Sequence, residues 1–262
     1  MGTTKISLIL PSFLRAHLLD CTLWSVQKQQ IDFDLDIVVV NDGLEDDTES
    51  VCKKYTTLNI KYVFSGQRNK PNELKSRVAG FALNIGVRQC EGDIILLSCA
   101  EVYHLNDCLM RQTRQLINNK KIIVTPRFMY FDDSGLYSNF IMLSLHTSKA
   151  TPTDVGWNTA KNIYAIKMPY FMGMWKEDYM AIGGYDEDLT GYAFDDNDFV
   201  DRITANGCEY YYTDAQIVHL YHGATCDSMP QPQNKAWLHN QSIYLKKKGT
   251  IVRNQNREWG KL

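Results

Sequence analysis

Short apolar runs alternate with amphipathic segments along the first half of the chain. Residues 6–10 and 36–40 are strand-like runs, and each is stopped by turn residues. Between them, apolar residues recur at helical spacing from position 18 to position 26. The same alternation continues and predicts strands at 60–64, 93–97 and 122–125, with helices up to about 54, at 74–87 and at 109–116. Short apolar strands joined by helices predict an α/β fold with a mostly parallel central sheet flanked by helices.

The second half has a different pattern. Residues 127–167 are rich in Tyr, Phe, Ser and Thr and show only weak periodicity. An acidic segment follows, and then strand-like residues at 210–212 and 215–220 and a polar C-terminal helix at about 234–248. Because this half has no convincing core of its own, we expect one continuous domain, 1–262, rather than two.

Composition and charge argue against several classes of function. The net charge is −2 and no long Lys/Arg run is present, so no nucleic-acid partner is expected. The apolar stretches are too short to cross a bilayer, and no N-terminal targeting pattern is visible. Seven cysteines without a CxxC pair indicate reduced thiols, which favours a cytoplasmic protein without a transmembrane segment.

The segment 183–202 contains seven carboxylates between Asp186 and Asp201. If a helix begins near Asp195, Asp196 shares a face with the apolar residues at offsets of three, four and seven, whereas Asp198 and Asp201 fall on the opposite side. A carboxylate on an apolar face is costly unless it is paired or functional. The alternative is an acidic helix N-terminus, which the helix dipole favours.

Polar residues follow three of the predicted strands directly. They are Pro11 and Ser12, then Asn41-Asp42-Gly43, and then Ser98 to Glu101. Ligands of open parallel sheets bind beyond the carboxyl ends of the strands, so these turns predict a pocket at one edge of the sheet. Neither GxGxxG after the first strand nor GxxxxGK[ST] is present, which disfavours dinucleotide oxidoreductases and P-loop enzymes.

Four stretches of this chain, ISLILPSF, DIVVVNDG, ALNIGVRQCEGDIILLSCAEV and GGYDEDLTGYAFDDNDFVDR, resemble the inverting family 2 glycosyltransferases of the GT-A fold. The resemblance covers roughly residues 5–222. It implies a single GT-A-like domain that binds a nucleotide-sugar, often a UDP-sugar, and passes the sugar to the hydroxyl of a glycan or another acceptor. The nucleotide-sugar half would be about 1–125 and the acceptor half about 126–262.

The resemblance assigns roles to several residues. Pro11 and Ser12 would flank the nucleobase, and Asp42 would accept a hydrogen bond from a pyrimidine N–H. Of the acid doublet, Asp196 would serve as the general base, and Asp195 would help to hold the acceptor. Asn84 and Gly86 match an Asn-x-Gly motif that would lie near the ribose and diphosphate. Arg77 would contact a phosphate, and Ser98, at the end of the third strand, is the last substrate-binding candidate.

The expected metal motif is altered in this chain. Family members usually carry Asp-x-Asp after the strand, but here the sequence is Ser98-Cys99-Ala100-Glu101, and Glu101 is the only carboxylate. With His222 or His219 and phosphate oxygens, Glu101 makes a reasonable shell for Mn²⁺ or Mg²⁺, with Mn²⁺ favoured. A zinc site that adds Cys226 to the two histidines is a weaker alternative, because a fourth ligand is not evident.

Aromatic residues near the acidic segment are candidates for an acceptor groove, since sugars stack on aromatic faces. Of Trp157, Trp175, Tyr185 and Tyr192, we favour Trp175. Two other functions stay open. A nucleotidyltransferase that makes a nucleotide-sugar would share the α/β core, although the glycine-rich loop of that class is missing. A non-catalytic sugar-nucleotide-binding module would explain the altered metal motif.

Overall fold

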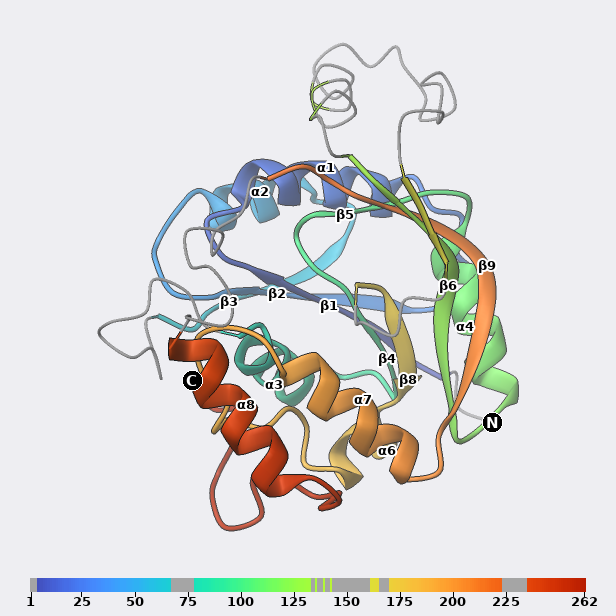
Figure 1. Cartoon of the computed structure of the whole chain (residues 1–262). Helices are drawn as coiled ribbons and strands as arrows, with labels where there is room; N and C mark the ends of the chain where they lie inside the picture. Colours follow the sequence, from blue (N-terminus) through green and yellow to red (C-terminus); the bar gives the residue numbers. More distant parts are fainter. Residues whose placement is uncertain are drawn as a thin grey trace.

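A computed structural model describes residues 4–66, 78–132, 135, 139, 142, 161–164, 170–222 and 235–262 (Figure 1). One sheet runs through both halves of the chain in the order β3-β2-β1-β4-β8-β6-β9-β5, and β7 pairs with β6. Its strands are β1 (Ile6–Ser12), β2 (Leu35–Asn41), β3 (Asn59–Phe64), β4 (Ile94–Leu97), β5 (Val102–His104), β6 (Ile122–Phe131), β7 (Lys161–Tyr164), β8 (Met172–Trp175) and β9 (Glu209–His219).

The four strands from the first half, β3-β2-β1-β4, are all parallel, as predicted. The second half adds β8, which is antiparallel to β4 and to β6, while β6 and β9 pair in parallel. The sheet is therefore mixed. The α/β fold class is confirmed, but β5, β7 and β8 are not among the predicted strands.

Helices cover both faces of the sheet. They are α1 (Ala16–Gln27), α2 (Thr48–Lys54), α3 (Gly80–Gln89), α4 (Cys108–Asn118), α6 (Lys176–Ala181), α7 (Asp195–Ala205) and α8 (Lys235–Lys247). Apolar residues of α1, α2 and α4 share one core with one face of the sheet, and those of α3, α6 and α7 share a second core with the other face.

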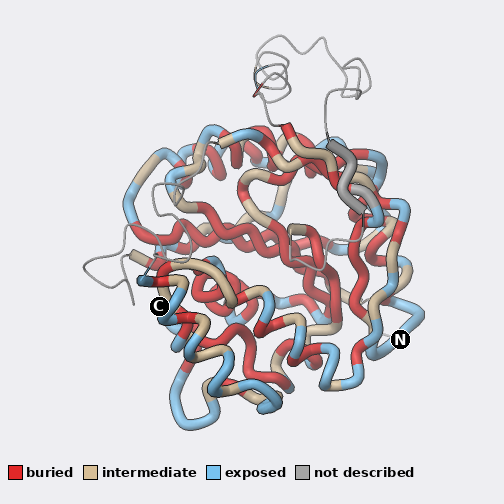
Figure 2. Tube along the Cα trace, in the orientation of Figure 1, coloured by how far each residue is buried: buried red, intermediate tan, exposed pale blue. Residues whose placement is uncertain are grey.

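Side-chain alternation along the central strands produces these two cores. In β2, Ile37 and Val39 belong to the first core, and Val38 and Val40 belong to the second. A strand buried on both faces has no polar side, which explains its continuous apolar run. Figure 2 shows the buried residues concentrated along these strands. Among the residues that the structure describes, no helix combines the length and the apolar character that a membrane span requires.

Candidate active site

The carboxyl ends of β1 and β2 form the first part of the site. Ser12 pairs with Asn41 in the sheet, and the amide of Asp42 donates to the carbonyl oxygen of Ser12 (2.7 Å). The carboxylate of Asp42 is buried and accepts a hydrogen bond from Ser65 Oγ at the end of β3 (2.7 Å). Pro11 lies within β1, and its carbonyl oxygen accepts from the amide of Ala100 (3.1 Å). The structure therefore brings the three predicted strand ends together.

A cluster of possible metal ligands lies beside this edge. One ligand atom from each of Glu101, His219 and His222 lies within 4.8 Å of the others, and Glu101 Oε1 is 3.9 Å from His222 Nε2. The pairing of Val102 with His219 between β5 and β9, and the hydrogen bond from the amide of Leu220 to the carbonyl oxygen of Glu101 (2.8 Å), hold the two segments together. The short strand β5 thus explains why residues so distant in sequence meet.

The charge state of this cluster suits a cation. Burial, followed by the electrostatic effect of His222 and Arg15, lowers the pKa of His219 to about 4, so the imidazole of His219 is neutral at pH 7. Burial raises the pKa of Glu101, against the effect of His222 and Arg15. Neutral imidazole and carboxylate oxygen are common ligands of divalent transition metals. The donor set therefore fits a metal such as Mn²⁺.

Arg15 is a neighbour that the sequence analysis did not predict. It precedes α1, and its Nη2 lies 3.2 Å from Nδ1 of His222, 207 residues away in the chain. The preceding residue, Leu14, has a left-handed backbone with φ of 54°. The sequence signal for this neighbour was a basic residue three positions after the end of β1.

The acid doublet begins α7, as predicted. The backbone amides of Asp195, Asp196 and Gly80 hydrogen-bond the buried carboxylate of Asp195, yet burial outweighs them and raises its pKa to about 6. Asp196 is half-buried and accepts a long hydrogen bond from Tyr185 Oη (3.5 Å). Loss of solvent and the like charge of Asp195 raise its pKa well above the usual value.

The predicted orientation of this helix was partly wrong. The buried residues of α7 are Asp195, Asp198, Phe199, Arg202 and Ile203, so Asp198 lies inside rather than on the opposite, solvated side. Asp198 Oδ2 accepts from Arg202 Nε (2.7 Å), and its Oδ1 accepts from Arg253 Nη2 (2.7 Å). Two arginines make burial of this carboxylate possible, and one of them comes from the C-terminal segment.

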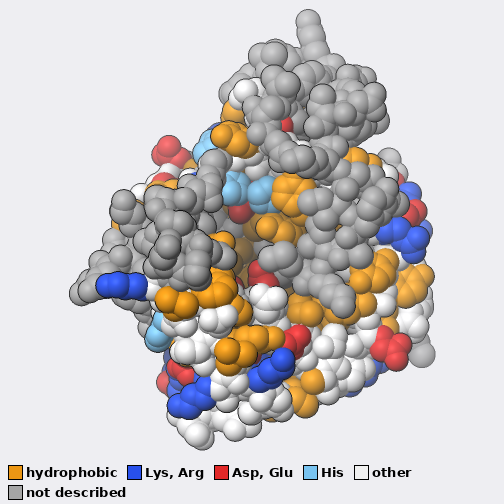
Figure 3. All heavy atoms as spheres, in the orientation of Figure 1, with side chains coloured by type: hydrophobic (Ala, Val, Ile, Leu, Met, Phe, Trp, Pro, Cys, Tyr) orange, Lys and Arg blue, Asp and Glu red, His pale blue; other side chains and the backbone are white. Residues whose placement is uncertain are grey.

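Charges of the metal-ligand cluster and of the acid doublet act on the same two side chains, Cys99 and Tyr170. The negative charges of Glu101 and of Asp196 both raise the pKa of the Cys99 thiol, after burial. Cys99, Asp196 and Glu101 likewise raise the pKa of Tyr170, again after burial. Such charge effects require proximity. Figure 3 shows a hollow in this face of the molecule where histidine and acidic side chains gather around hydrophobic ones.

Other predicted residues lie in the interior. Asn84 is fully buried on α3, where its Oδ1 accepts from Tyr179 Oη (2.7 Å) and from the amide of Tyr185 (2.8 Å). Gly86 packs against β1, since a Cβ there would lie 2.3 Å from Ile9 Cγ2. The role of both residues near the ribose and diphosphate stays a prediction.

Ser98 also points inward. Its Oγ donates to the carbonyl oxygen of Tyr170 (3.0 Å) and lies 3.4 Å from Nε2 of the buried His104. Burial lowers the pKa of His104 to about 3, so the ring is neutral. Ser98 therefore supports the turn that carries Glu101.

Trp175 is not brought to the cluster. It pairs with Ile94, the first residue of β4, at the end of that strand opposite to Glu101. Its indole Nε1 donates to the carbonyl oxygens of Leu116 (3.0 Å) and Asn119 (2.9 Å). This placement does not fit the predicted acceptor groove. Tyr170, in contrast, was missed and lies between the two parts of the site. Arg77, Trp157 and Cys226 fall outside the described residues.

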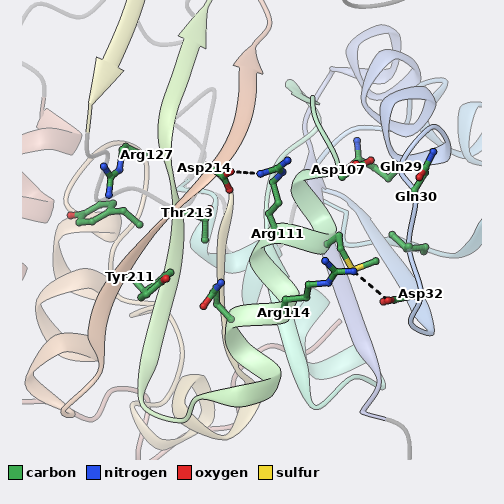
Figure 4. Close-up of a pocket in the computed structure, with 14 residues that line it drawn as sticks. Gln29, Gln30, Asp32, Asp107, Arg111, Arg114, Arg127, Tyr211, Thr213 and Asp214 are labelled. Carbon is green, nitrogen blue, oxygen red and sulfur yellow. Dashed lines mark hydrogen bonds and ion pairs between the residues drawn. The ribbon is translucent and has the colours of Figure 1, made fainter.

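A cavity of 1140 Å³ lies elsewhere, between α4, β9 and the end of α1 (Figure 4). None of the predicted site residues lines it. Two of its three arginines have acidic partners, because Arg111 pairs with Asp214 and Arg114 lies 3.6 Å from Asp32. The cavity thus contains neither the acid doublet nor the candidate metal ligands of the sheet edge.

Comparisons with known proteins agree with this geometry. Residues 7–183 match the model of the glycosyl transferase family 2, and residues 168–223 match that of the N-terminal domain of galactosyltransferase. The chondroitin synthase of Escherichia coli is 23% identical in an alignment of 243 residues that covers 83% of this chain and 34% of that protein. The chondroitin synthase of Pasteurella multocida (strain Pm70) is 23% identical in an alignment of 246 residues that covers 82% of this chain and 24% of that protein. The chain thus spans about a third or less of these curated relatives.

Solved structures share the fold. The mannosyltransferase PcManGT from Pyrobaculum calidifontis, in complex with GDP-Man and Mn²⁺, superposes with a TM-score of 0.56 at 19% identity, covering 94% of this chain and 63% of that one. The structure of GalNAc-T7 with UDP, GalNAc and Mn²⁺ superposes with a TM-score of 0.64 at 12% identity, covering 93% of this chain and 48% of that one. The structure of S. aureus TarS 1-349 with UDP-GlcNAc superposes with a TM-score of 0.62 at 16% identity, covering 93% of this chain and 66% of that one. The architecture is that of the GT-A glycosyltransferases. The match over most of its length shows that this chain belongs to glycosyl transferase family 2.

Proposed function

We propose that this chain transfers a sugar from a nucleotide-sugar, most simply a UDP-sugar, to an acceptor hydroxyl with inversion, and that Asp196 is the general base. What carries the proposal is that the charges of Asp196 and of Glu101 both act on Cys99 and on Tyr170, which supports a place for the two carboxylates beside the hollow of Figure 3. A general base and a cation that border one cavity can act in the same reaction, the base on the acceptor hydroxyl and the cation on the departing diphosphate.

The donor would occupy the edge formed by β1, β2 and β3. Asp42 is buried at this edge, and Ser65 orients its carboxylate, which makes it a suitable acceptor for the N–H of a uracil ring. Pro11 and Ser12 would flank the base on the β1 side. UDP in the TarS and GalNAc-T7 complexes supports this choice of donor class.

Glu101, His219 and His222 would hold a divalent cation. Mn²⁺ is favoured over Mg²⁺ because Mg²⁺ is bound by oxygen ligands, whereas two of these three ligands are imidazoles. When bound, such a cation neutralises the charge that grows on the departing diphosphate. Arg15 would bind the diphosphate beside it, since the guanidinium matches phosphate geometry. Mn²⁺ in the PcManGT and GalNAc-T7 complexes supports a metal-dependent donor site.

Asp196 would accept the proton of the acceptor hydroxyl as its oxygen attacks the anomeric carbon. Its pKa is raised by burial and by the like charge of Asp195, so its ionised carboxylate is a stronger base than that of an ordinary aspartate. The bond to the diphosphate oxygen breaks as the new glycosidic bond forms, so a single displacement inverts the anomeric configuration. Asp195, held by backbone amides, would help to position the acceptor.

Asp196→Asn tests the assignment. We expect turnover to fall about 10²–10⁴-fold, the usual contribution of general-base catalysis, while nucleotide-sugar binding with Mn²⁺ stays as in the wild type. Asn197→Ala, at the neighbouring exposed position, is the matched control. Turnover of Asp196→Asn near that of the control would refute the base, and a product with retained configuration would refute the single displacement.

The donor can be found with a thermal-shift panel of nucleotide-sugars, with and without Mn²⁺. A ligand at 100 times its dissociation constant stabilises the folded state by about 2.7 kcal/mol, which gives a measurable shift. Because Ser98 points inward and leaves Glu101 as the single carboxylate of its turn, a binding module without activity is the rival. Binding without transfer to any acceptor, at any Mn²⁺ concentration, would favour that rival. Release of pyrophosphate from a nucleoside triphosphate would instead indicate a nucleotidyltransferase.

A further inference from the structure

The turn that precedes the acid doublet has an unusual backbone. Ala193 and Phe194 have φ values of 68° and 70°, so two successive residues with side chains are left-handed directly before Asp195. This conformation is disfavoured for residues other than glycine and persists only where surrounding contacts hold it. The direction in which α7 presents Asp195 and Asp196 depends on this turn.

One side chain from α8 holds the turn. Asn240 is fully buried, and its Oδ1 accepts from the amide of Thr190 (3.0 Å). Its Nδ2 donates to the carbonyl oxygens of Tyr192 (3.0 Å) and Ala193 (2.8 Å). An amide side chain provides the donor and the acceptor that these three backbone groups need together.

The same face of α8 makes the neighbouring contacts. Trp237, Asn240, Tyr244 and Lys247 follow one another at spacings of three, four and three, which places them in one stripe along the helix. The ring of Phe194 lies between those of Trp237 (5.2 Å) and Tyr244 (5.4 Å). The stripe therefore packs against the acidic segment that carries the doublet.

The ends of the stripe add polar contacts to that segment. Tyr244 Oη donates to Asp201 Oδ2 (2.6 Å) within α7. Lys247 pairs with Asp186 (2.6 Å) and Asp188 (2.5 Å), upstream of the turn. All four members of the stripe thus contact residues of the 186–201 segment directly.

We propose that Asn240 is a positioning residue that fixes the strained 190–194 turn and thereby aims the Asp195–Asp196 doublet at the acceptor. This inference rests on the proposed function, because it assumes that Asp196 is the base. The nucleotide edge at β1 and β2 lies outside the network, so the loss of Asn240 should affect the chemical step and leave donor binding intact.

Asn240→Ala tests this, and Ser242→Ala is the control, because Ser242 is exposed and its Oγ bonds only the carbonyl oxygen of His239 in its own helix (2.9 Å). Asn240→Asp keeps the acceptor for Thr190 but sets a carboxylate against two carbonyl oxygens. We expect both Asn240 variants to lose at least about 10-fold in kcat, with the KM for the donor and the Mn²⁺-dependent UDP thermal shift unchanged, at a temperature where each is folded.

If folded Asn240→Ala has the same kcat as Ser242→Ala, the proposal is overturned. If Asn240→Ala and Asn240→Asp do not fold, Asn240→Ser decides, because the smaller hydroxyl group has one donor and cannot bond both carbonyl oxygens. Wild-type kcat in Asn240→Ser would then overturn the proposal, and a lower kcat with unchanged donor KM would support it. Asp196→Asn in the same assay separates the two ideas: an active Asp196→Asn refutes the base, whereas an inactive one beside a fully active Asn240→Ala refutes only the positioning role.

Discussion

Glu101 Oε1 lies 3.9 Å from Nε2 of His222, although the residues are far apart in the sequence. The first follows β4 and the second follows β9, and the three-residue strand β5 joins these segments by pairing with β9. The same pairing places His219 within 4.8 Å of both. The metal-ligand cluster therefore depends on the carboxyl end of the sheet being intact.

Removal of one ligand should weaken metal binding. We expect Glu101→Gln and His222→Ala to lower the apparent affinity for Mn²⁺ at least about 10-fold, since even residues that only support metal ligands contribute that much. The measurement is the Mn²⁺ concentration needed for half of the UDP thermal shift. His239→Ala, an exposed histidine on α8, is the control. Equal Mn²⁺ dependence in all three variants would contradict this metal site.

The raised pKa of Asp195 should make stability depend on pH. In the folded state the pKa is about 6, against an ordinary value of 3.8, so between these values the folded state holds a proton that the unfolded state has lost. Stability then falls as the pH rises through this window and levels off above it. At 1.36 kcal/mol per pKa unit, the decline amounts to about 3 kcal/mol.

Asp195→Asn stays neutral at every pH and should lack this decline. Urea unfolding at pH 4, 5, 6 and 7 measures the difference in unfolding free energy between the variant and the wild type. We expect the difference to move in favour of the variant by about 2 kcal/mol between pH 4 and pH 7, since part of the decline lies below pH 4. A difference that is constant over this range would show that Asp195 is not destabilised by its charge.

Continuous apolar runs made the parallel half of the sheet predictable. β1, β2 and β4 are buried on both faces, so their sequences contain almost no polar residues, and the turns at their ends are easy to recognise. β5 has only three residues, and β8 reads MGMW, where Gly173 packs against Leu96 and Val124 and leaves no room for a Cβ. Short strands of this kind owe their structure to neighbours that a local pattern does not reveal.

In the site, likewise, the sequence revealed the residues that adjoin recognisable strands and helices but not the contacts between distant residues. Asp42 and Glu101 follow recognisable strand ends, and the doublet follows a recognisable helix start. The contact between Arg15 and His222 and the burial of Asp198 against Arg253 depend on residues that are 207 and 55 positions apart. Helical spacing placed Asp198 on the side opposite to Asp196, and the distant arginine, which that spacing does not reveal, makes the burial of its carboxylate possible.

The buried pair of Asp198 with Arg202 and Arg253 should be essential for stability. Asp198→Ala leaves two arginines, each about 3% exposed, without this carboxylate. Breaking a buried ion pair on one side costs about 3–5 kcal/mol, so we expect a loss of that order in the free energy of unfolding, measured by urea denaturation. The exposed neighbour variant Asn197→Ala should change it little. Equal stability of the two variants would mean that solvent reaches the arginines.

Asp42 should contribute to nucleotide affinity. A hydrogen bond to a charged group is worth about 1.5–3 kcal/mol, so Asp42→Ala should weaken UDP binding by about 10- to 150-fold in calorimetric titration. Asp47→Ala removes an exposed carboxylate just before α2 and should leave the affinity unchanged. Unchanged UDP affinity in Asp42→Ala would place the nucleobase elsewhere.

Gly86 should act through packing. A Cβ at this position would lie 2.3 Å from Ile9 Cγ2 and 3.3 Å from Val40 Cγ2, so Gly86→Ala would push α3 away from β1 and β2. Overpacking of a core typically costs about 1–3 kcal/mol, and we expect that loss in the free energy of unfolding.

A double-mutant cycle with Ile9→Ala identifies the cause, because this change removes the methyl group that the new Cβ would meet. The double variant should be less destabilised than the sum of the single changes. UDP affinity in folded Gly86→Ala separates packing from the ribose contact that the family resemblance implies. An affinity equal to that of the wild type supports packing alone, whereas a fall in affinity without a fall in stability would mean that the nucleotide touches this glycine.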